Sequence, residues 1–484
     1  MSTSRLEIDL GAIERNLARV LRLVGPGPDR TLGGAGVCAV LKQDAYGMGA
    51  ARIAKRLAVA GAKMFAVYNL DEARSLFESV TDAPILVLMP VAGVDRNDPL
   101  YRAAAGGRLH LVIHDMDQLI AVSELAGRVG VSMPVHVQLD TGLSRGGERP
   151  DEAARIVERV LSSGRVRLAG LMTHFSSPGD DPALTAGQWG MFREFVDRVS
   201  PMLKAAAASG HNPALIGHRG TLISGGIAEL EVHAANSCGA FRSRAYHGTM
   251  VRMGESLYGM VGGAVWNKAG HGLADMEFSA EAAMMEPAVR WTSTIAHIEE
   301  IPAGWPVGYG STWRAPKRAD GKMTKIAMIP VGYADGYPRS LGGSPTGGPG
   351  MVGFTGKRWD RKTIHGVQAA TTENASGETL FAPVVGRVSM DQITVDVTDL
   401  PPSFVQPGRA GLELAGAEVE LVGVNASAPN HLPALANAGG TIAHELLCRM
   451  GPRLDRVYKY TGVSPGAAGR EQSAGRAEPA PAAV

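Results

Sequence analysis

The chain has 484 residues, of which 45% are hydrophobic and 20% are charged, and its formal net charge is +1. This composition is typical of a soluble globular protein, and the length predicts about two or three domains. The nearly balanced charge argues against a nucleic-acid or acidic-membrane partner, and no stretch reaches the roughly 18 uninterrupted apolar residues of a membrane span.

The N-terminus, MSTSRLEIDLGAIERNL, carries acidic residues where a signal peptide would place its apolar run. We therefore expect a cytoplasmic protein. The three cysteines, Cys38, Cys238 and Cys448, are odd in number and far apart in sequence. They predict reduced thiols and not a disulfide framework.

From Val37 to about Met260, short runs rich in Val, Ile and Leu alternate with helical patterns such as ARIAKRLAVAGA, in which Ile53 and Leu57 share one face. About eight β-α units within roughly 220 residues favour a (β/α)8 TIM-type barrel over an open sheet. Strands that are apolar throughout are expected when both faces of a parallel sheet are buried. The candidate strands are VCAVLK, MFAVYN, PILVLMP, LHLVIHD, PVHVQLD, LAGLMTHF, LEVHAAN and MVRMGESLYG.

The barrel domain is assigned to residues 1–274, although the first 12 or so residues are free to pack with the next domain. Within it, SGHNPALIGHRGTLISGG is interpreted as an inserted hairpin or loop. Alternating short strands after Met260 predict a β-rich domain over residues 275–462. A Gly-, Thr- and Ser-rich stretch near 341–380 predicts a long surface excursion, and residues 463–484 predict a disordered tail.

Polar residues gather at the predicted carboxyl ends of the barrel strands, which is where this fold places its active sites. Each of them taken alone is more often structural. A group of six or more on one rim instead predicts a functional site, and its members are Lys42, Asp140, Arg145, His174, His233, Asn236, Ser237 and Arg252.

A lysine at such a position has a specific chemical use. A desolvated ε-amine loses part of its preference for the charged form, so it can form a Schiff base with an aldehyde. Pyridoxal phosphate is the aldehyde most often bound by proteins, and it also needs phosphate donors. Ser237 and the region of Gly254 lie after the last two barrel strands, the usual phosphate site of the fold.

The motif K-x-D-A-Y-G-x-G after an apolar strand resembles the cofactor-lysine motif of the alanine racemase family, whose members are fold-type III pyridoxal-phosphate enzymes. Further blocks resemble that family in the same order along nearly the whole chain. They are EIDLGAIERNL, LDTGLSR, MTHFSSPGD, HAANS, VRMGESLYG, VGYGSTW, VGYADGYPR, VGRVSMDQ and GTIAHELLCRMGPR.

The resemblance implies a homodimeric racemase that supplies D-alanine for peptidoglycan and needs no metal. Lys42 would hold the cofactor and act as the base on one face of the substrate, and Tyr309 of the partner subunit as the base on the other. Arg252, oriented by His233, would meet the pyridine nitrogen without protonating it, because its pKa is above about 12. The other implied cofactor residues are Tyr46, His174, Asn236, Ser237, Gly254 and His444, and the implied substrate residues are Arg145, Met390, Asp391 and Tyr333.

Two positions depart from the family pattern. Gln138 stands where many members have a lysine that orients the neighbouring arginine, and a neutral amide supplies no full charge there. His444 stands where a phosphate-binding tyrosine is usual, and imidazole donates in a pH-dependent way. Longer segments near 210–228 and 341–380 leave the substrate range open to serine or lysine. A fold-type III lyase or decarboxylase and a non-catalytic pyridoxal-phosphate carrier are the alternative functions.

Overall fold

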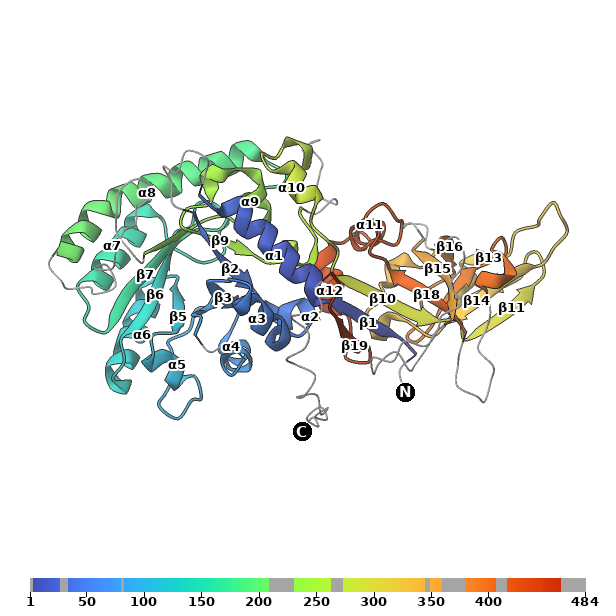
Figure 1. Ribbon diagram of the computed structural model, residues 1–484, viewed down its shortest axis with the longest axis horizontal. Helices are drawn as coiled ribbons and strands as arrows, with labels where there is room; N and C mark the ends of the chain where they lie inside the picture. Colours follow the sequence, from blue (N-terminus) through green and yellow to red (C-terminus); the bar gives the residue numbers. More distant parts are fainter. Residues whose placement is uncertain are drawn as a thin grey trace.

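The computed structural model describes residues 3–26, 34–79, 82–208, 230–262, 273–343, 349–358, 379–405 and 416–462. The predicted insertion at 209–226, most of the predicted excursion near 341–380 and the predicted tail lie outside these residues. The molecule is elongated, with a helix-covered barrel at one end and a β-rich part at the other (Figure 1). Among the described helices, none is long and apolar enough to cross a membrane.

The barrel prediction is confirmed. In the described chain, eight parallel strands form one sheet in the order β8-β7-β6-β5-β4-β3-β2-β9. Two backbone hydrogen bonds connect the end strands β8 and β9 and bring the sheet close to a closed barrel. Thr249 N donates to Val232 O (2.8 Å), and Arg252 N donates to Ala235 O (2.9 Å). The strands are β2 Gly36–Val40, β3 Met64–Val67, β4 Ile85–Val87, β5 Leu109–Ile113, β6 Met133–Gln138, β7 Val166–Met172, β8 Glu231–His233 and β9 Met250–Met253.

The helices of this part cover the outside of the barrel with amphipathic faces (Figure 1). Ile53 and Leu57 of α3 are fully buried, as predicted. Asn69 and Asp115 cap α4 and α6, because each side chain accepts from the backbone N–H of the third helical residue. The helices are α1 Leu10–Val24, α3 Ala50–Val59, α4 Leu70–Phe77, α5 Tyr101–Ala105, α6 Met116–Val129, α7 Pro150–Leu161, α8 Pro182–Ala208, α9 Ser237–Arg242 and α10 Ser279–Ala283, with 3-10 turns η2 Arg244–Tyr246, η3 Glu255–Tyr258 and η5 Leu273–Asp275.

The β-rich part contains a nine-stranded sheet, within the described residues, in the order β11-β14-β17-β16-β15-β18-β10-β1-β19. Its strands are β1 Arg5–Asp9, β10 Val289–Thr294, β11 His297–Ile301, β14 Thr324–Ile329, β15 Met351–Arg358, β16 Leu380–Val385, β17 Ile393–Asp396, β18 Ala417–Val422 and β19 Asp455–Lys459. The other elements are the β12 Pro306–Val307 and β13 Trp313–Arg314 hairpin, α11 Leu432–Ala438, α12 Ala443–Arg449, and the 3-10 turns η6 Tyr309–Ser311, η7 Tyr333–Asp335, η8 Arg339–Leu341 and η10 Pro402–Phe404.

The prediction that residues 341–380 form a surface excursion is wrong for β15. This strand pairs with both β16 and β18, and Val352 and Phe354 are fully buried. The alternation of apolar side chains is only two residues long and is flanked by glycines, so the composition of the surrounding stretch concealed it.

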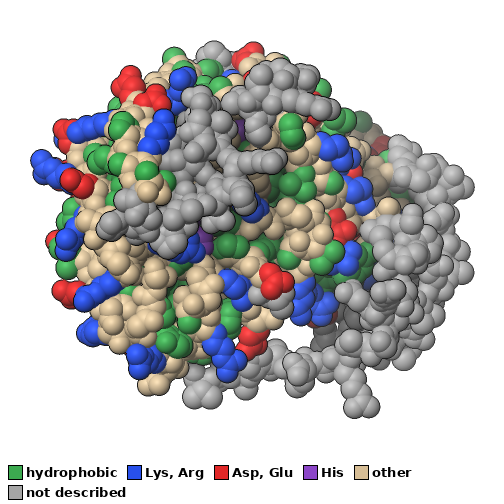
Figure 2. Space-filling model, turned by 60° about the vertical axis from the view of Figure 1, so that its left-hand side comes forward, with side chains coloured by type: hydrophobic (Ala, Val, Ile, Leu, Met, Phe, Trp, Pro, Cys, Tyr) green, Lys and Arg blue, Asp and Glu red, His purple; other side chains and the backbone are tan. Residues whose placement is uncertain are grey.

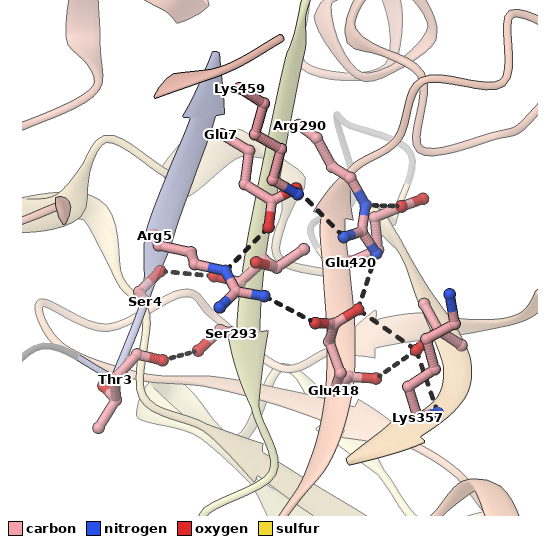
Figure 3. A network of polar contacts seen from close by, with 12 residues as sticks. Thr3, Ser4, Arg5, Glu7, Arg290, Ser293, Lys357, Glu418, Glu420 and Lys459 are labelled. Carbon is pink, nitrogen blue, oxygen red and sulfur yellow. Dashed lines mark hydrogen bonds and ion pairs between the residues drawn. The ribbon is translucent and has the colours of Figure 1, made fainter. Parts of the chain in front are cut away.

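The first and last strands of the described chain lie side by side in this sheet. β1 pairs antiparallel with β10 and parallel with β19. Across these strands and β18, three cationic and three acidic side chains form a connected network (Figure 3). Arg290 contacts Glu418 at 2.8 Å and Glu420 at 2.5 Å, and Lys459 contacts Glu7 at 2.5 Å. Because the carboxylates are buried, removing one cation would leave charge without compensation, a change that costs about 3–5 kcal/mol.

Candidate active site

Lys42 is presented by an unusual turn. Strand β2 ends at Val40, two residues earlier than predicted, and Lys42 opens the short helical element α2 Lys42–Gly47. Four successive residues, Gln43 to Tyr46, have φ between 49° and 60°. Left-handed backbone costs roughly 1–2 kcal/mol for each residue with a side chain, so other contacts must hold this turn.

Some of these contacts come from neighbouring barrel elements. Asp44 Oδ1 accepts from the backbone N–H of Ala50 at 2.7 Å, and Glu72 Oε1 accepts from Gln43 N at 2.8 Å. Further contacts come from β19. Arg456 Nε donates to Gly47 O at 2.7 Å, and Tyr458 Oη donates to Met48 O at 3.1 Å.

Arg456 also joins the turn to the segment that follows α12. Besides Gly47, its guanidinium donates to the carbonyls of Met450, Gly451 and Leu454 at 3.0–3.2 Å. A guanidinium has five donors in a rigid plane, so one side chain satisfies carbonyl groups from two segments at once. The position of Lys42 is therefore tied to the β-rich part of the chain.

Several cationic or basic groups gather around Lys42. Burial lowers the pKa of Lys42, and the charge of Arg145 lowers it further. Burial is also the main reason why the pKa of His174 is well below its usual value, followed by the charges of Arg252, Arg145 and Lys42. This arrangement is suited to an anionic ligand, because such a ligand relieves the repulsion among these groups.

Arg252 lies in β9 and is held almost entirely by acceptors from neighbouring strands. Its Nη1 donates to His233 Nδ1 and to His233 O, each at 2.9 Å, and its Nη2 donates to Thr173 O at 2.7 Å and to Ala234 O at 3.0 Å. Nη2 also lies 3.2 Å from His174 Nδ1. Burial lowers the pKa of Arg252 to about 10, below the expected value of more than about 12, but the group remains a cation at neutral pH.

A chain of buried imidazoles extends from Arg252 into the barrel. His233 Nε2 lies 2.9 Å from His136 Nδ1, and His136 Nε2 lies 2.9 Å from His110 Nδ1. Because a guanidinium only donates, His233 Nδ1 must accept, and each ring must then pass one N–H to the next. All three imidazoles are therefore neutral, in agreement with burial, which lowers the pKa of His110 to about 3 and the other two well below their usual value.

Gly170 makes this chain possible. β7 lies between β6 and β8, so His136 must reach past it to contact His233. A Cβ at position 170 would lie 2.1 Å from His136 Nδ1, which is far inside contact distance. Glycine at this strand position leaves the room that the imidazole pair occupies.

Five predicted cofactor residues lie together at another part of the rim. Ser237 Oγ accepts from Gly254 N at 3.0 Å, and Asn236 accepts from Gly239 N and thereby caps α9. A Cβ at position 254 would lie 2.2 Å from Tyr46 Oη, so the phenol rests directly over this glycine. His444 reaches the same region from α12, with Nδ1 3.2 Å from Glu255 Oε2.

Gln138 fixes the segment that carries Arg145, but not through the guanidinium. Its Nε2 donates to the carbonyl oxygens of Arg145 (3.3 Å) and Gly146 (2.9 Å). Asp140 completes the loop by accepting from the backbone N–H groups of residues 142–144 at 2.9–3.0 Å. Hydrogen bonds to the backbone therefore fix the position of the Arg145 segment, and Gln138 supplies no charge beside the guanidinium.

The remaining predicted site residues lie on the β-rich part. Tyr309 lies in η6, which connects β12 to β13, and 74% of it is exposed. Strand β13 is far from α2 (Figure 1). Tyr333 and Met390 are exposed as well, and their segments are joined by the bond from Tyr333 N to Ser389 O (3.0 Å). Asp391 pairs with Arg453 at 2.8 Å. Within one chain, the predicted residues thus form one group at the barrel rim, which His444 joins from α12, and a second, exposed group on the β-rich part.

Comparison with known proteins agrees with this architecture. Residues 8–228 match the family described as the alanine racemase N-terminal domain, and residues 288–458 match its C-terminal domain. The chain belongs to the alanine racemase family. The alanine racemase of Desulfovibrio desulfuricans is 32% identical over 93% of this chain and 97% of its own length.

Solved structures of alanine racemases share the fold. The biosynthetic alanine racemase from Pseudomonas aeruginosa is 27% identical, with a TM-score of 0.66 over 95% of this chain and all of that chain. The alanine racemase from Bartonella henselae, solved with covalently bound pyridoxal phosphate, has a TM-score of 0.65 at 23% identity, over 95% of this chain and all of that chain.

The sequence interpretation missed several residues of this alanine racemase family site. Arg456 and Glu255 gave no signal, because each looks like an ordinary surface charge until the fold brings it to the rim. His110 and His136 lie within apolar strands, where the alternation of side chains places them inside the barrel. That alternation was available as a signal, since two buried histidines on neighbouring strands need partners.

Figure 2 shows that acidic and basic side chains are interspersed over the barrel end of the molecule.

Proposed function

We propose that this chain is a pyridoxal-phosphate-dependent racemase that interconverts L- and D-alanine. The observation that carries the proposal is the amine of Lys42, which a left-handed turn presents at the barrel rim and whose pKa is lowered by desolvation and by the charge of Arg145. Burial and that charge both favour the neutral amine, which is the form that attacks an aldehyde.

The residues around Lys42 fit the cofactor. Arg145 and Arg252 supply positive charge for an anionic ligand, and Arg252 would meet the pyridine nitrogen as a donor that keeps its proton. Ser237, Tyr46 and the backbone at Gly254 would hold the phosphate, because the missing side chain at 254 lets the Tyr46 phenol and Ser237 Oγ come close to the same stretch of backbone. When bound, the cofactor delocalises the negative charge left on the substrate carbon after a proton is removed.

Racemisation needs a base on each face of the substrate carbon. Lys42 would remove or return the proton on one face. Tyr309 of a second copy would do so on the other, with Met390 and Asp391 near the substrate carboxylate and Tyr333 at the access channel. The exposed positions of Tyr309, Tyr333 and Met390 support this assignment, because an apolar, aromatic surface on the β-rich part is suited to association with another chain.

The alternatives are less compatible with the same residues. A decarboxylase would gain from a protonated pyridine nitrogen and hence from a carboxylate partner, whereas Arg252 is a donor at that position. A carrier without catalysis would have no use for the exposed tyrosine surface. We place the reaction in the cytoplasm, where D-alanine would serve peptidoglycan synthesis.

The test is to incubate the purified protein with pyridoxal phosphate and L-alanine and to measure D-alanine by chiral chromatography. Serine and lysine should be assayed in parallel to define the substrate range. Borohydride reduction followed by peptide mass spectrometry should locate the cofactor on Lys42, and the Lys42→Ala variant is the control. Cofactor-loaded protein that racemises no amino acid would contradict the proposal.

A subunit-mixing experiment tests whether Tyr309 acts across a dimer. Lys42→Ala and Tyr309→Phe should each be inactive by itself. After mixing and exchange of subunits, about half of the dimers would be mixed and each would contain one intact site, so roughly a quarter of the wild-type activity should return. If both residues served the same chain's site, mixing would restore no activity.

A further inference from the structure

The phosphate end of the site contains a pair of titratable side chains from distant parts of the chain. Glu255 lies in η3 between Gly254 and Ser256, and His444 lies in α12. His444 Nδ1 is 3.2 Å from Glu255 Oε2, and the two side chains are 39% and 20% exposed. The pair is therefore close enough to share a proton and open enough to exchange it with solvent.

Glu255 borders the predicted phosphate residues. Ser237 Oγ accepts from the backbone N–H on either side of Glu255, from Gly254 at 3.0 Å and from Ser256 at 3.5 Å. Burial is the main cause that raises the pKa of Tyr46 and of Cys238, and the charge of Glu255 is the second cause. An acidic group at this place would repel a phosphate unless a positive charge compensates it.

The elements packed against His444 leave Glu255 as its carboxylate partner. Within α12, Glu445 pairs with Arg449 at 2.5 Å and also contacts Thr441. α2 faces α12, and α11 carries no ionisable side chain between Leu432 and Ala438. The ionisable groups on the three elements around the imidazole are Lys42, Asp44 and Tyr46 of α2, Glu255 and Tyr258 of η3, and Glu445, Cys448 and Arg449 of α12.

We propose that Glu255 and His444 form a proton-linked latch for the phosphate group of the ligand. This inference rests on the proposed function, because pyridoxal phosphate is the phosphate-bearing ligand. One proton from solvent binds the imidazole, and the resulting imidazolium compensates Glu255 and attracts the phosphate dianion. When the imidazole is neutral, Glu255 faces the dianion alone, so phosphate binding weakens as the pH rises and His444 loses its proton.

The test compares pyridoxal phosphate with pyridoxal, which lacks the phosphate but reacts with Lys42 through the same aldehyde. The ratio of the two dissociation constants isolates the phosphate from the titration of Lys42. We expect the preference for the phosphate form to fall several-fold, with a limit of about tenfold, as the pH rises from about 6.5 to 9, since one unit of pKa linkage corresponds to a factor of about ten. Above pH 7 the phosphate itself is mainly a dianion and contributes little to the change.

Two variants at the pair and one control make the result specific. Glu255→Gln should bind the phosphate form more tightly at pH 9 than wild type does and should flatten the pH dependence. His444→Tyr, which keeps a donor but titrates only at high pH, should flatten it as well. Glu299→Gln, which removes an exposed acid on β11, should keep the wild-type profile.

Calorimetry in two buffers of different ionisation enthalpy provides an independent reading. Wild type should take up part of a proton when it binds pyridoxal phosphate but not when it binds pyridoxal, and His444→Tyr should take up none in either case. A wild-type preference that does not change with pH, or an unchanged profile in Glu255→Gln, would overturn the latch while leaving the proposed function intact. Failure of both aldehydes to bind would overturn the proposed function and the latch together.

Discussion

Replacing Gly170 with alanine tests the buried imidazole chain directly. The new Cβ would lie 2.1 Å from His136 Nδ1 and 2.9 Å from Glu231 O, so His136 has to move. Its hydrogen bond to His233 would then break, and the Nε2–H of His233 would remain buried without its acceptor. His233 in turn is the ring that accepts from Arg252.

The expected loss of stability has two parts. A buried donor that loses its partner costs about 1–3 kcal/mol. Forcing a methyl group into a packed interior costs roughly the same, about 1–3 kcal/mol. Gly170→Ala should therefore lower the free energy of unfolding by about 2–6 kcal/mol, because both effects act at one site.

The assay is urea unfolding of the cofactor-free protein followed by fluorescence and circular dichroism. Gly164→Ala is the matched control, because a Cβ at position 164 meets nothing within 4 Å. Nitrogen-15 spectra of the imidazoles should also show a changed tautomer pattern in Gly170→Ala. If the two variants unfold at the same urea concentration and the imidazole spectra do not change, the interpretation of the chain is wrong.

Three further predictions concern the charges of the molecule. Burial alone would raise the pKa of Glu7, but Arg290 and Lys459 lower it below the usual value. The ionised Glu7 therefore stabilises the fold fully above about pH 5, and this stabilisation is lost as the pH falls through the folded-state pKa. Arg290→Met should lower the urea midpoint at pH 7 and flatten this acid dependence. Arg456→Ala should slow the incorporation of pyridoxal phosphate, measured by its visible absorption, with little change in circular dichroism, and Arg456→Lys should restore only part of the rate. Arg145→Gln should raise the pKa of Lys42 and move the pH profile of cofactor incorporation upward, and an unchanged profile would contradict the electrostatic coupling of the two residues.

Most of the barrel was predictable because its strands are buried on both faces. Such strands are apolar along their whole length and are easy to separate from amphipathic helices such as α3. β15 was not predictable in this way, because the position of Val352 and Phe354 in the sheet depends on pairing with β16 and β18. Sheet pairing between distant segments leaves little local trace in a glycine-rich sequence.

The barrel half of the candidate site followed from strand ends, which the sequence makes visible. The turn that presents Lys42 did not. Gln43, Ala45 and Tyr46 have no local preference for left-handed backbone, and only Asp44 is of a type that visits it readily. Tertiary contacts from Ala50, Glu72 and β19 hold this conformation, so a local interpretation could only place a lysine near the end of a strand.

The two faces of β19 explain how the lysine turn depends on the rest of the chain. Successive side chains of a strand point to opposite sides, so Lys459 lies on one face while Arg456 and Tyr458 lie on the other. Lys459 binds Glu7 within the charge network of the nine-stranded sheet, and Arg456 and Tyr458 bind the backbone at Gly47 and Met48. One strand thus connects the buried charges of the β-rich part to the turn that holds Lys42. Removal of β19 should therefore release this turn even though every residue of the barrel rim is retained.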